Sequence, residues 1–127
     1  MFLKVKGHTI FIESEIKEQK SEIERRLALY RPQTREYDIS GRTVILLDDG
    51  AATGALRAVA RWVKKHGPTN LIIAVPVAPK DVVRLLTNEA DQVEIIKKPA
   101  EFGSIEQFYQ DFAAVTDENV IWLAGEH

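Results

Sequence analysis

The chain has 127 residues, the size of one ordinary domain and too short for two full-sized ones. Its 17 lysine and arginine residues against 19 acidic residues give a formal net charge of -2, so no basic excess points to nucleic acid as a partner. The absence of cysteine excludes disulfides, thiolate catalysis and zinc-thiolate sites. No apolar run approaches the roughly 20 residues of a membrane helix, and no signal-peptide core is present, so we expect a cytoplasmic protein.

The first 40 residues predict an arm and one helix. Phe2–Glu13 alternates apolar and polar residues on either side of a glycine, which suits a short hairpin or one extended arm. From Ser14, a candidate cap, the spacing predicts a charge-rich helix that stops at Pro32, followed by a polar connector to residue 41. One face of this helix is apolar, and we expect a narrow buried stripe of Ile16, Ile23, Leu27 and Tyr30.

Residues 41–127 predict a core of alternating strands and helices. We expect strands at Thr43–Leu47, Leu71–Val75 and Val93–Ile96, the first covered on both faces because it is continuously apolar. Helices are expected between them at Gly54–His66 and Pro79–Leu86. The inward face of the first helix should carry Leu56, Val59, Trp62 and Val63. This order demands a mainly parallel α/β sheet with right-handed crossovers, in a single domain spanning residues 1–127.

The C-terminal part predicts two more helices. Ser104 precedes Gln107 by the spacing of a capping box, and Thr116 is placed to open a last short helix. The apolar residues that follow the capping box share one helical face, which is more often core than binding site: Ile105, Phe108, Tyr109 and Phe112.

The residues with a chemical use follow the first strand. Asp48 and Asp49 end the apolar run and lead into Gly50–Gly54 and a helix, within the string VILLDDGAATGAL at Val44–Leu56. Small residues let backbone N–H groups approach phosphate oxygens, the helix N-terminus adds positive potential, and the Thr53 hydroxyl can donate a further hydrogen bond. Two carboxylates at the carboxyl end of a strand are good acceptors for a pair of sugar hydroxyls. The loop therefore predicts a ribose phosphate site, although two acids can also simply end a strand before a tight turn.

The string resembles the signature of type I phosphoribosyltransferases, in which apolar residues lead into two acids, a short loop reading A-T-G and a helix. The other common phosphate loops, GxxxxGK[ST] and GxGxxG, are absent. Further segments resemble a bacterial and archaeal group of predicted phosphoribosyltransferases: ERR and YR within Glu24–Arg31, GRTVIL at Gly41–Leu46, AVPVAP at Ala74–Pro79 and FYQDF at Phe108–Phe112. The resemblance covers most of the chain and implies a three-layer, mainly parallel α/β sheet of phosphoribosyltransferase type.

By this resemblance, Asp48 and Asp49 bind the ribose hydroxyls of phosphoribosyl pyrophosphate. The residues implied to wrap its 5′-phosphate are Gly50, Ala51, Ala52, Thr53, Gly54 and Ala55. Mg²⁺ would accompany the pyrophosphate, with no metal ligand supplied directly by the protein. Val77, Ala78 and Phe102 are candidates to line the cleft or stack on the acceptor base, although prolines beside Val77 can also serve to leave a strand. No catalytic residue is identified.

Three departures from the family pattern bear on activity. Leu56 stands where the family commonly has Thr, which removes a phosphate contact worth about 1 kcal/mol. Ala52 replaces an aspartate of enzymes that act on 6-oxopurines, so that subclass loses support. The pyrophosphate loop and the flexible catalytic loop of the family are not found before residue 41, so the chain resembles a C-terminal portion truncated on its N-terminal side.

The absence of the N-terminal strand and loops of the family bears on the expected assembly and function. Loss of a parallel strand would bare the edge beside Thr43–Leu47, so we expect a homodimer or a partner subunit there, unless the arm at Phe2–Phe11 covers it. The function that the resemblance implies is a phosphoribosyltransferase that binds phosphoribosyl pyrophosphate and moves ribose 5-phosphate to a nitrogen base. The alternatives are a non-catalytic regulator that binds a ribose phosphate or nucleotide, and one subunit of a split phosphoribosyltransferase.

Overall fold

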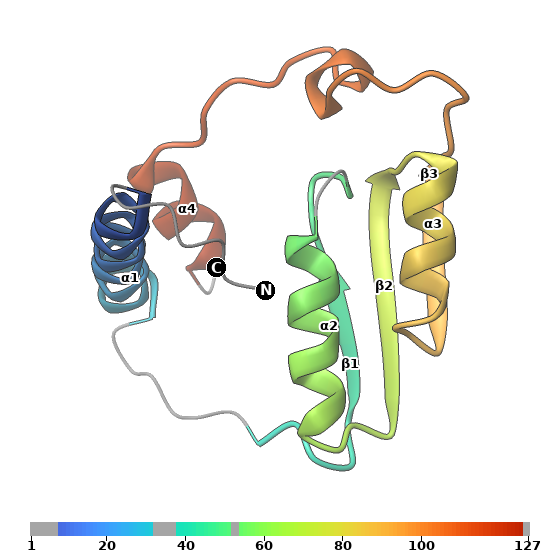
Figure 1. The fold of residues 1–127 in the computed structure, drawn as a ribbon, viewed down its shortest axis with the longest axis horizontal. Coiled ribbons are helices and arrows are strands. Elements are labelled where there is room, and N and C mark those ends of the chain that lie inside the picture. The colour runs from blue at the N-terminus through green and yellow to red at the C-terminus, as the bar shows by residue number, and fades with distance from the viewer. Residues whose placement is uncertain (1–7, 32–37, 52–53, 126–127) are drawn as a thin grey trace. The chain divides into compact units, whose positions relative to one another are not determined.

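The computed structural model describes residues 8–31, 38–51 and 54–125. They fall into two compact units, one of residues 1–36 with 114–127 and one of residues 37–113 (Figure 1). In the described part of the chain, no helix is both long enough and apolar enough to cross a membrane.

The larger unit is built on a parallel sheet with the strand order β1-β2-β3. The strands are β1 (Thr43–Leu47), β2 (Asn70–Val77) and β3 (Gln92–Lys97), which confirms the predicted parallel α/β arrangement. Because both neighbours of β2 run parallel to it, all three carboxyl ends meet at one edge of the sheet. Strand β2 continues two residues beyond the predicted end, through Pro76, whose missing N–H fits the absence of Pro76 from the pairing with β3.

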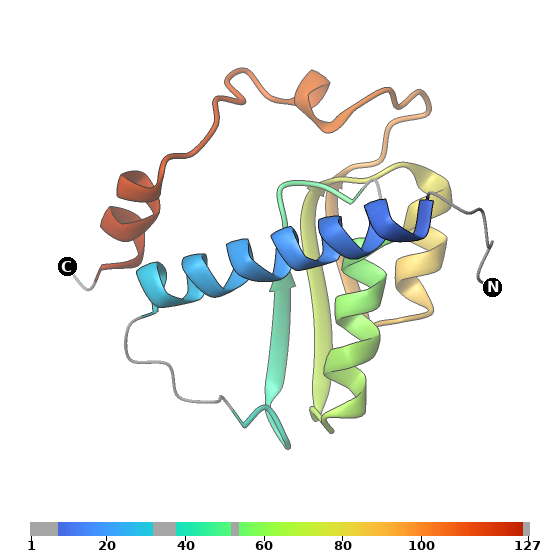
Figure 2. The same ribbon diagram turned by 60° about the vertical axis from the view of Figure 1, so that its left-hand side comes forward.

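Helices α2 (Ala55–Lys65) and α3 (Lys80–Thr87) lie on the same face of the sheet (Figure 1, Figure 2). Every second residue of β2 is buried beneath them, as Leu71, Ile73, Val75 and Val77. The helices contribute the other side of this core with Leu56, Ala60, Val63 and Leu86. Each buried aliphatic side chain of this size stabilises the fold by roughly 1.5–3 kcal/mol through removal from water.

The inward face of α2 differs from the prediction at two positions. Val59 is 46% exposed and Trp62 is 57% exposed, so both lie outside the core. The buried stripe runs through Leu56, Ala60 and Val63, because a spacing of four and three residues keeps one line along a helix. Trp62 instead packs at the surface against His66, with their ring centroids 4.0 Å apart.

The opposite face of the sheet is open within residues 38–113. Ile45 is 56% exposed, Leu47 75% and Ile96 90%, so the prediction that the first strand is covered on both faces is wrong. The physical reason is that both crossovers lead in the same direction across the sheet, and right-handed crossovers then place both helices on one side. A hollow of about 370 Å³ on this open face is lined by side chains that include Leu47, Pro76 and Ile96.

Glu89, just after α3, ties that helix to α2. Its carboxylate accepts hydrogen bonds from Arg57 at 3.0 Å and from Arg61 at 2.8 Å. The hydrogen bond from Arg61, then that from Arg57, holds the pKa of Glu89 below its ordinary value. These ion pairs therefore weaken as the pH falls through that lowered pKa.

The smaller unit consists of α1 (His8–Tyr30) and α4 (Asp117–Ala124). Asp117 joins the two helices, since it accepts hydrogen bonds from Arg25 at 2.8 Å and from the Tyr30 hydroxyl. Thr116 caps α4 as predicted, and its side chain accepts from the backbone N–H of Asn119 at 3.3 Å.

Two predictions about the N-terminal region are corrected. Residues His8–Glu13 belong to α1 and are not extended, whereas the rest of the proposed arm lies outside the described residues. The apolar stripe of α1 is not buried, because its isoleucines at 16 and 23 and its leucine at 27 are 44–56% exposed. The stripe is present in the sequence, but α4 covers little of it.

A pair of leucine substitutions tests the one-sided core. Leu71→Ala, at a fully buried position, should lower the free energy of unfolding by about 2–5 kcal/mol. Leu47→Ala, on the open face, should change it by less than about 0.5 kcal/mol at concentrations at which the chain is a monomer. Urea denaturation measures both values. Equal losses would mean that the open face is covered in solution.

Candidate functional site

The site is the turn that connects β1 to α2, at the carboxyl edge of the sheet. Asp48, Asp49, Gly50 and Ala51 follow the strand directly, and Gly54 is the residue before α2. The predicted phosphate contacts at residues 52 and 53, Ala52 and Thr53, lie outside the described residues. Open parallel sheets bind their ligands at this edge.

Ala51 anchors the turn to the neighbouring strand. Its backbone N–H donates to the Val77 carbonyl at 3.0 Å, and its side chain is buried. This amide is therefore committed to the sheet, whereas the sequence pattern alone had offered it to a phosphate. The contact continues the ladder between β1 and β2 beyond the end of β1 and fixes where the two acids project.

The two acids lie side by side at the exposed start of the turn. The backbone N–H of Asp49 donates to Oδ1 of Asp48 at 2.9 Å. Burial, and then the charge of Asp48, raise the pKa of Asp49 above its ordinary value of 3.8. Two carboxylates held this close repel one another, and hydroxyl groups or a cation brought between them would relieve that repulsion.

The N-terminus of α2 leaves room for an anion. Gly54 has ordinary helical angles, φ -72° and ψ -7°, and a Cβ placed on it would meet no atom of the described residues within 4 Å. The first turn of α2 carries no acidic residue that would repel a phosphate. A helix N-terminus with open space beside it is a suitable phosphate site.

Leu56 explains one departure from the family pattern. Its side chain is only 7% exposed and belongs to the core between the sheet and its helices. The position that would carry a threonine hydroxyl at the phosphate is therefore used for packing. The chain gains apolar burial here and gives up one hydrogen-bond donor.

A segment far away in the sequence closes over the turn. Ile105 begins a short 3-10 helix, η1 (Ile105–Phe108), and its side chain lies against Gly50. The Tyr109 hydroxyl donates to the backbone carbonyl of Asp49. Because these residues were predicted as the packed face of a longer helix, their contact with the site was missed.

The predicted helix through Phe112 is not formed. The capping-box spacing is confirmed, since Oε1 of Gln107 accepts from the backbone N–H groups of Gly103 at 3.1 Å and Ser104 at 3.2 Å. The helix nevertheless ends after one turn, because Tyr109 is extended with φ -114° and ψ 141°. The aromatic residues pack in pairs instead, with the rings of Tyr109 and Phe112 5.0 Å apart.

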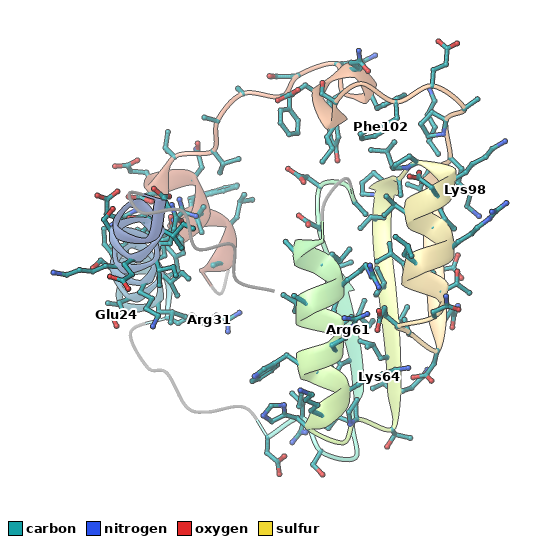
Figure 3. All side chains as sticks on the ribbon, in the orientation of Figure 1. Glu24, Arg31, Arg61, Lys64, Lys98 and Phe102 are labelled. Atoms are coloured by element: carbon teal, nitrogen blue, oxygen red, sulfur yellow. The ribbon has the colours of Figure 1, made fainter. Side chains whose placement is uncertain are left out.

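The three suggested cleft residues are placed differently from one another. Val77 and Ala78 are buried, at 1% and 0% exposure, so their side chains present no surface to a ligand. Phe102 is partly exposed and stacks on Phe108 with ring centroids 5.6 Å apart. Figure 3 shows Phe102 and Lys98 in the segment that follows β3, beyond the carboxyl edge of the sheet. Of the three, only Phe102 has a partly exposed side chain.

The described residues hold no group of three or more histidine or acidic side chains placed to bind a metal ion. A cation at Asp48 and Asp49 would therefore need further oxygen ligands from water or from a phosphorylated substrate.

Comparison of its sequence and fold relates this chain to known proteins. A sequence model of the phosphoribosyl transferase domain matches residues 3–113. Two Mycobacterium tuberculosis proteins, from strains CDC 1551 and H37Rv, bear names that provisionally assign them as phosphoribosyl transferases. Each is 32% identical to this chain over 106 residues, which is 83% of this chain and 24% of the relative.

The fold also matches a solved structure. The crystal structure of TT1426 from Thermus thermophilus superimposes with a TM-score of 0.74 at 34% identity. The match covers 91% of this chain and 56% of that one, so the chain spans about half of its structural relative. Because the domain match extends over well more than half of its residues, the chain belongs to the phosphoribosyl transferase family.

Proposed function

We propose that this chain binds phosphoribosyl pyrophosphate and transfers its ribose 5-phosphate to a nitrogen base. The observation that carries the proposal is the pair Asp48 and Asp49, set at the carboxyl end of β1 on the turn that leads to the N-terminus of α2 at Gly54. Acceptors for two sugar hydroxyls and a site for a phosphate thus lie on one short turn. One ribose phosphate satisfies both.

The chemistry that these residues supply is electrostatic. Departure of pyrophosphate leaves positive charge on the ribose ring, and nearby carboxylates stabilise that charge while hydrogen bonds hold the ring in place. We propose that Mg²⁺ arrives with the pyrophosphate, bound by phosphate oxygens and water, since the described residues offer no complete protein site. The acceptor base would approach past Phe102, whose ring suits stacking.

The alternative is a regulator, or one subunit of a split enzyme, that binds a ribose phosphate without turnover. Leu56 favours this alternative, because a buried leucine at this position supplies no hydroxyl to a phosphate. Calorimetry with phosphoribosyl pyrophosphate and Mg²⁺, followed by assay of pyrophosphate release with a panel of bases, separates the two. Binding without release in every case would support the regulator.

We also propose that a second copy or a partner subunit covers the edge of β1. In the described residues, β1 pairs with β2 and with no other strand, and its open-face side chains Ile45 and Leu47 are exposed. The strand carries no charge or proline that would discourage another strand from pairing with it. Exposed apolar edges of this kind are normally covered.

The paired acids are tested by Asp48→Asn and Asp49→Asn. Each substitution weakens one acceptor for a ribose hydroxyl, so affinity for phosphoribosyl pyrophosphate should fall at least about tenfold, the equivalent of one charge-assisted hydrogen bond. Isothermal titration calorimetry measures the change. Asp38→Asn is the matched control, since that carboxylate precedes β1 and accepts a bond from Ser40 that an amide oxygen can retain. Equal affinity in all four proteins would refute the assignment.

Asp49→Asn should affect stability in the opposite direction to ligand binding. The raised pKa of Asp49 means that the folded chain keeps this proton to higher pH than the unfolded chain, so the unaltered protein loses stability as the pH rises above 3.8. The variant does not titrate there. Relative to the unaltered chain, its free energy of unfolding should therefore be higher at about pH 7 than at about pH 3. A variant less stable at neutral pH would contradict the proposed repulsion.

Self-association is tested by light scattering. The unaltered chain should show twice the mass of one chain, and Ile45→Lys should return it to one chain mass by placing a charge on the open face. Val59→Lys is the control, because Val59 is similarly exposed on α2, across the sheet. A single-chain mass for the unaltered protein at about 100 µM, a working concentration that favours weak dimers, would exclude the homodimer.

A further inference from the structure

The segment Phe102–Tyr109, which we name the clasp, is in direct contact with the turn that carries the two acids. We propose that Ile105 and Tyr109 are positioning residues, which hold Asp49 and Gly50 in the conformation that accepts a ribose phosphate. The inference rests on the proposed function for its ligand. The contact itself is a property of the unliganded chain and is tested separately.

The contact between Ile105 and Gly50 explains why position 50 is a glycine. A Cβ built at Gly50 would lie 2.9 Å from Cγ1 of Ile105, 3.0 Å from Cδ1 and 3.1 Å from Cγ2. Carbon atoms do not approach one another so closely without a shift of the structure. Gly50 is buried, so the space that its missing side chain leaves is filled by Ile105. Glycine at this position therefore allows the clasp to pack against the turn. Gly54 differs, because no described residue lies close to it.

The second contact sets the orientation of one peptide plane. The Tyr109 hydroxyl donates to the carbonyl of Asp49, and that carbonyl is coplanar with the N–H of Gly50. The N–H groups of Asp49 and Gly50 both act on the Asp49 carboxylate, where they oppose the rise of its pKa. Tyr109 is thus linked to the acid through the backbone carbonyl of Asp49.

The clasp is itself held in shape. Gln107 accepts from the backbone of Gly103 and Ser104, and Phe102 stacks on Phe108. The ammonium group of Lys97, at the end of β3, lies 5.3 Å from the centre of the Phe108 ring. A cation near an aromatic face is attracted to it, which links the clasp to the strand. The turn is consequently held on two sides, by the hydrogen bond of Ala51 to β2 and by the clasp.

Tyr109→Phe tests the second contact, with Tyr30→Phe as its matched control. Both variants lose one hydroxyl that donates to an oxygen, but Tyr30 bonds Asp117 in the smaller unit. Hydrogen exchange of the unliganded full chain should speed up about tenfold at the amides of residues 49–51 in Tyr109→Phe, the equivalent of one hydrogen bond. It should not change there in Tyr30→Phe. Equal exchange in both would overturn the proposal.

Gly50→Ala and Ile105→Ala test the first contact as a double-mutant cycle. Gly50→Ala alone should weaken binding of phosphoribosyl pyrophosphate at least about tenfold, because the methyl group displaces Ile105 and the turn. Ile105→Ala alone should weaken it less. The double variant should regain most of the affinity, since the smaller side chain leaves room for the methyl group. A purely structural role elsewhere would give additive losses, which would overturn the proposal.

The two proposals fail in different ways. If the unaltered chain binds neither phosphoribosyl pyrophosphate nor ribose 5-phosphate, the proposed function is wrong. The claim that the clasp prepares the turn for a ribose phosphate is then wrong as well. The exchange measurement still decides whether Tyr109 holds the turn. If the chain binds and Tyr109→Phe binds equally well with unchanged exchange, the function stands and the clasp has no positioning role. Should Gly50→Ala fail to fold, recovery of folding in the double variant supports the contact, and its absence refutes it.

Discussion

The handedness of two crossovers determines both where this chain can do chemistry and which surface it leaves uncovered. Strands β1, β2 and β3 follow one another across the sheet in chain order, and each connection passes through a helix on the same side. The parallel arrangement brings three carboxyl ends to one edge, where the turn after β1 carries its acids. The same arrangement concentrates the buried residues on one face. Site and open surface are thus two results of one topology.

Within the site, binding and stability make opposite demands. Asp48 and Asp49 are adjacent acids at the end of a strand, and burial and mutual charge raise the pKa of the second. A chain under no functional requirement would gain stability by replacing one of them. The surrounding structure supports the arrangement instead, through the ladder bond of Ala51, the packing of Ile105 and the hydroxyl of Tyr109. Binding sites commonly hold charged groups in such unfavourable arrangements by contacts with the surrounding structure.

Local patterns were sufficient to predict the strands and helices of the parallel sheet, but not what packs against them. The strand at residues 43–47 has the predicted bounds, and the turn after it lies at the predicted edge, because strand and turn preferences depend on nearby residues. An apolar strand cannot show whether a second layer covers it, which is why the exposure of Ile45 was missed. The predicted inward face of α2 was wrong at Val59 and Trp62, since the small residue Ala60 lies on the buried line and these larger residues lie beside it.

The clasp was missed for a related reason. Ile105, Phe108 and Phe112 have helical spacing, which predicted one packed helix, whereas tertiary contacts stop the helix after a single turn. The contact between Ile105 and Gly50 joins residues far apart in the sequence, and no local pattern reports it. The only local signal was the capping box at Ser104 and Gln107, which located the start of the turn correctly.

The fit of Ile105 into the space beside Gly50 has a consequence for how this protein can change over generations. A larger residue at position 50 is acceptable only after position 105 has become smaller, because their atoms compete for one volume. A smaller residue at position 105 leaves a gap until position 50 grows. The two positions therefore form a matched pair in which either single step is a loss, so a lineage that keeps the turn is expected to keep both residues or to exchange both.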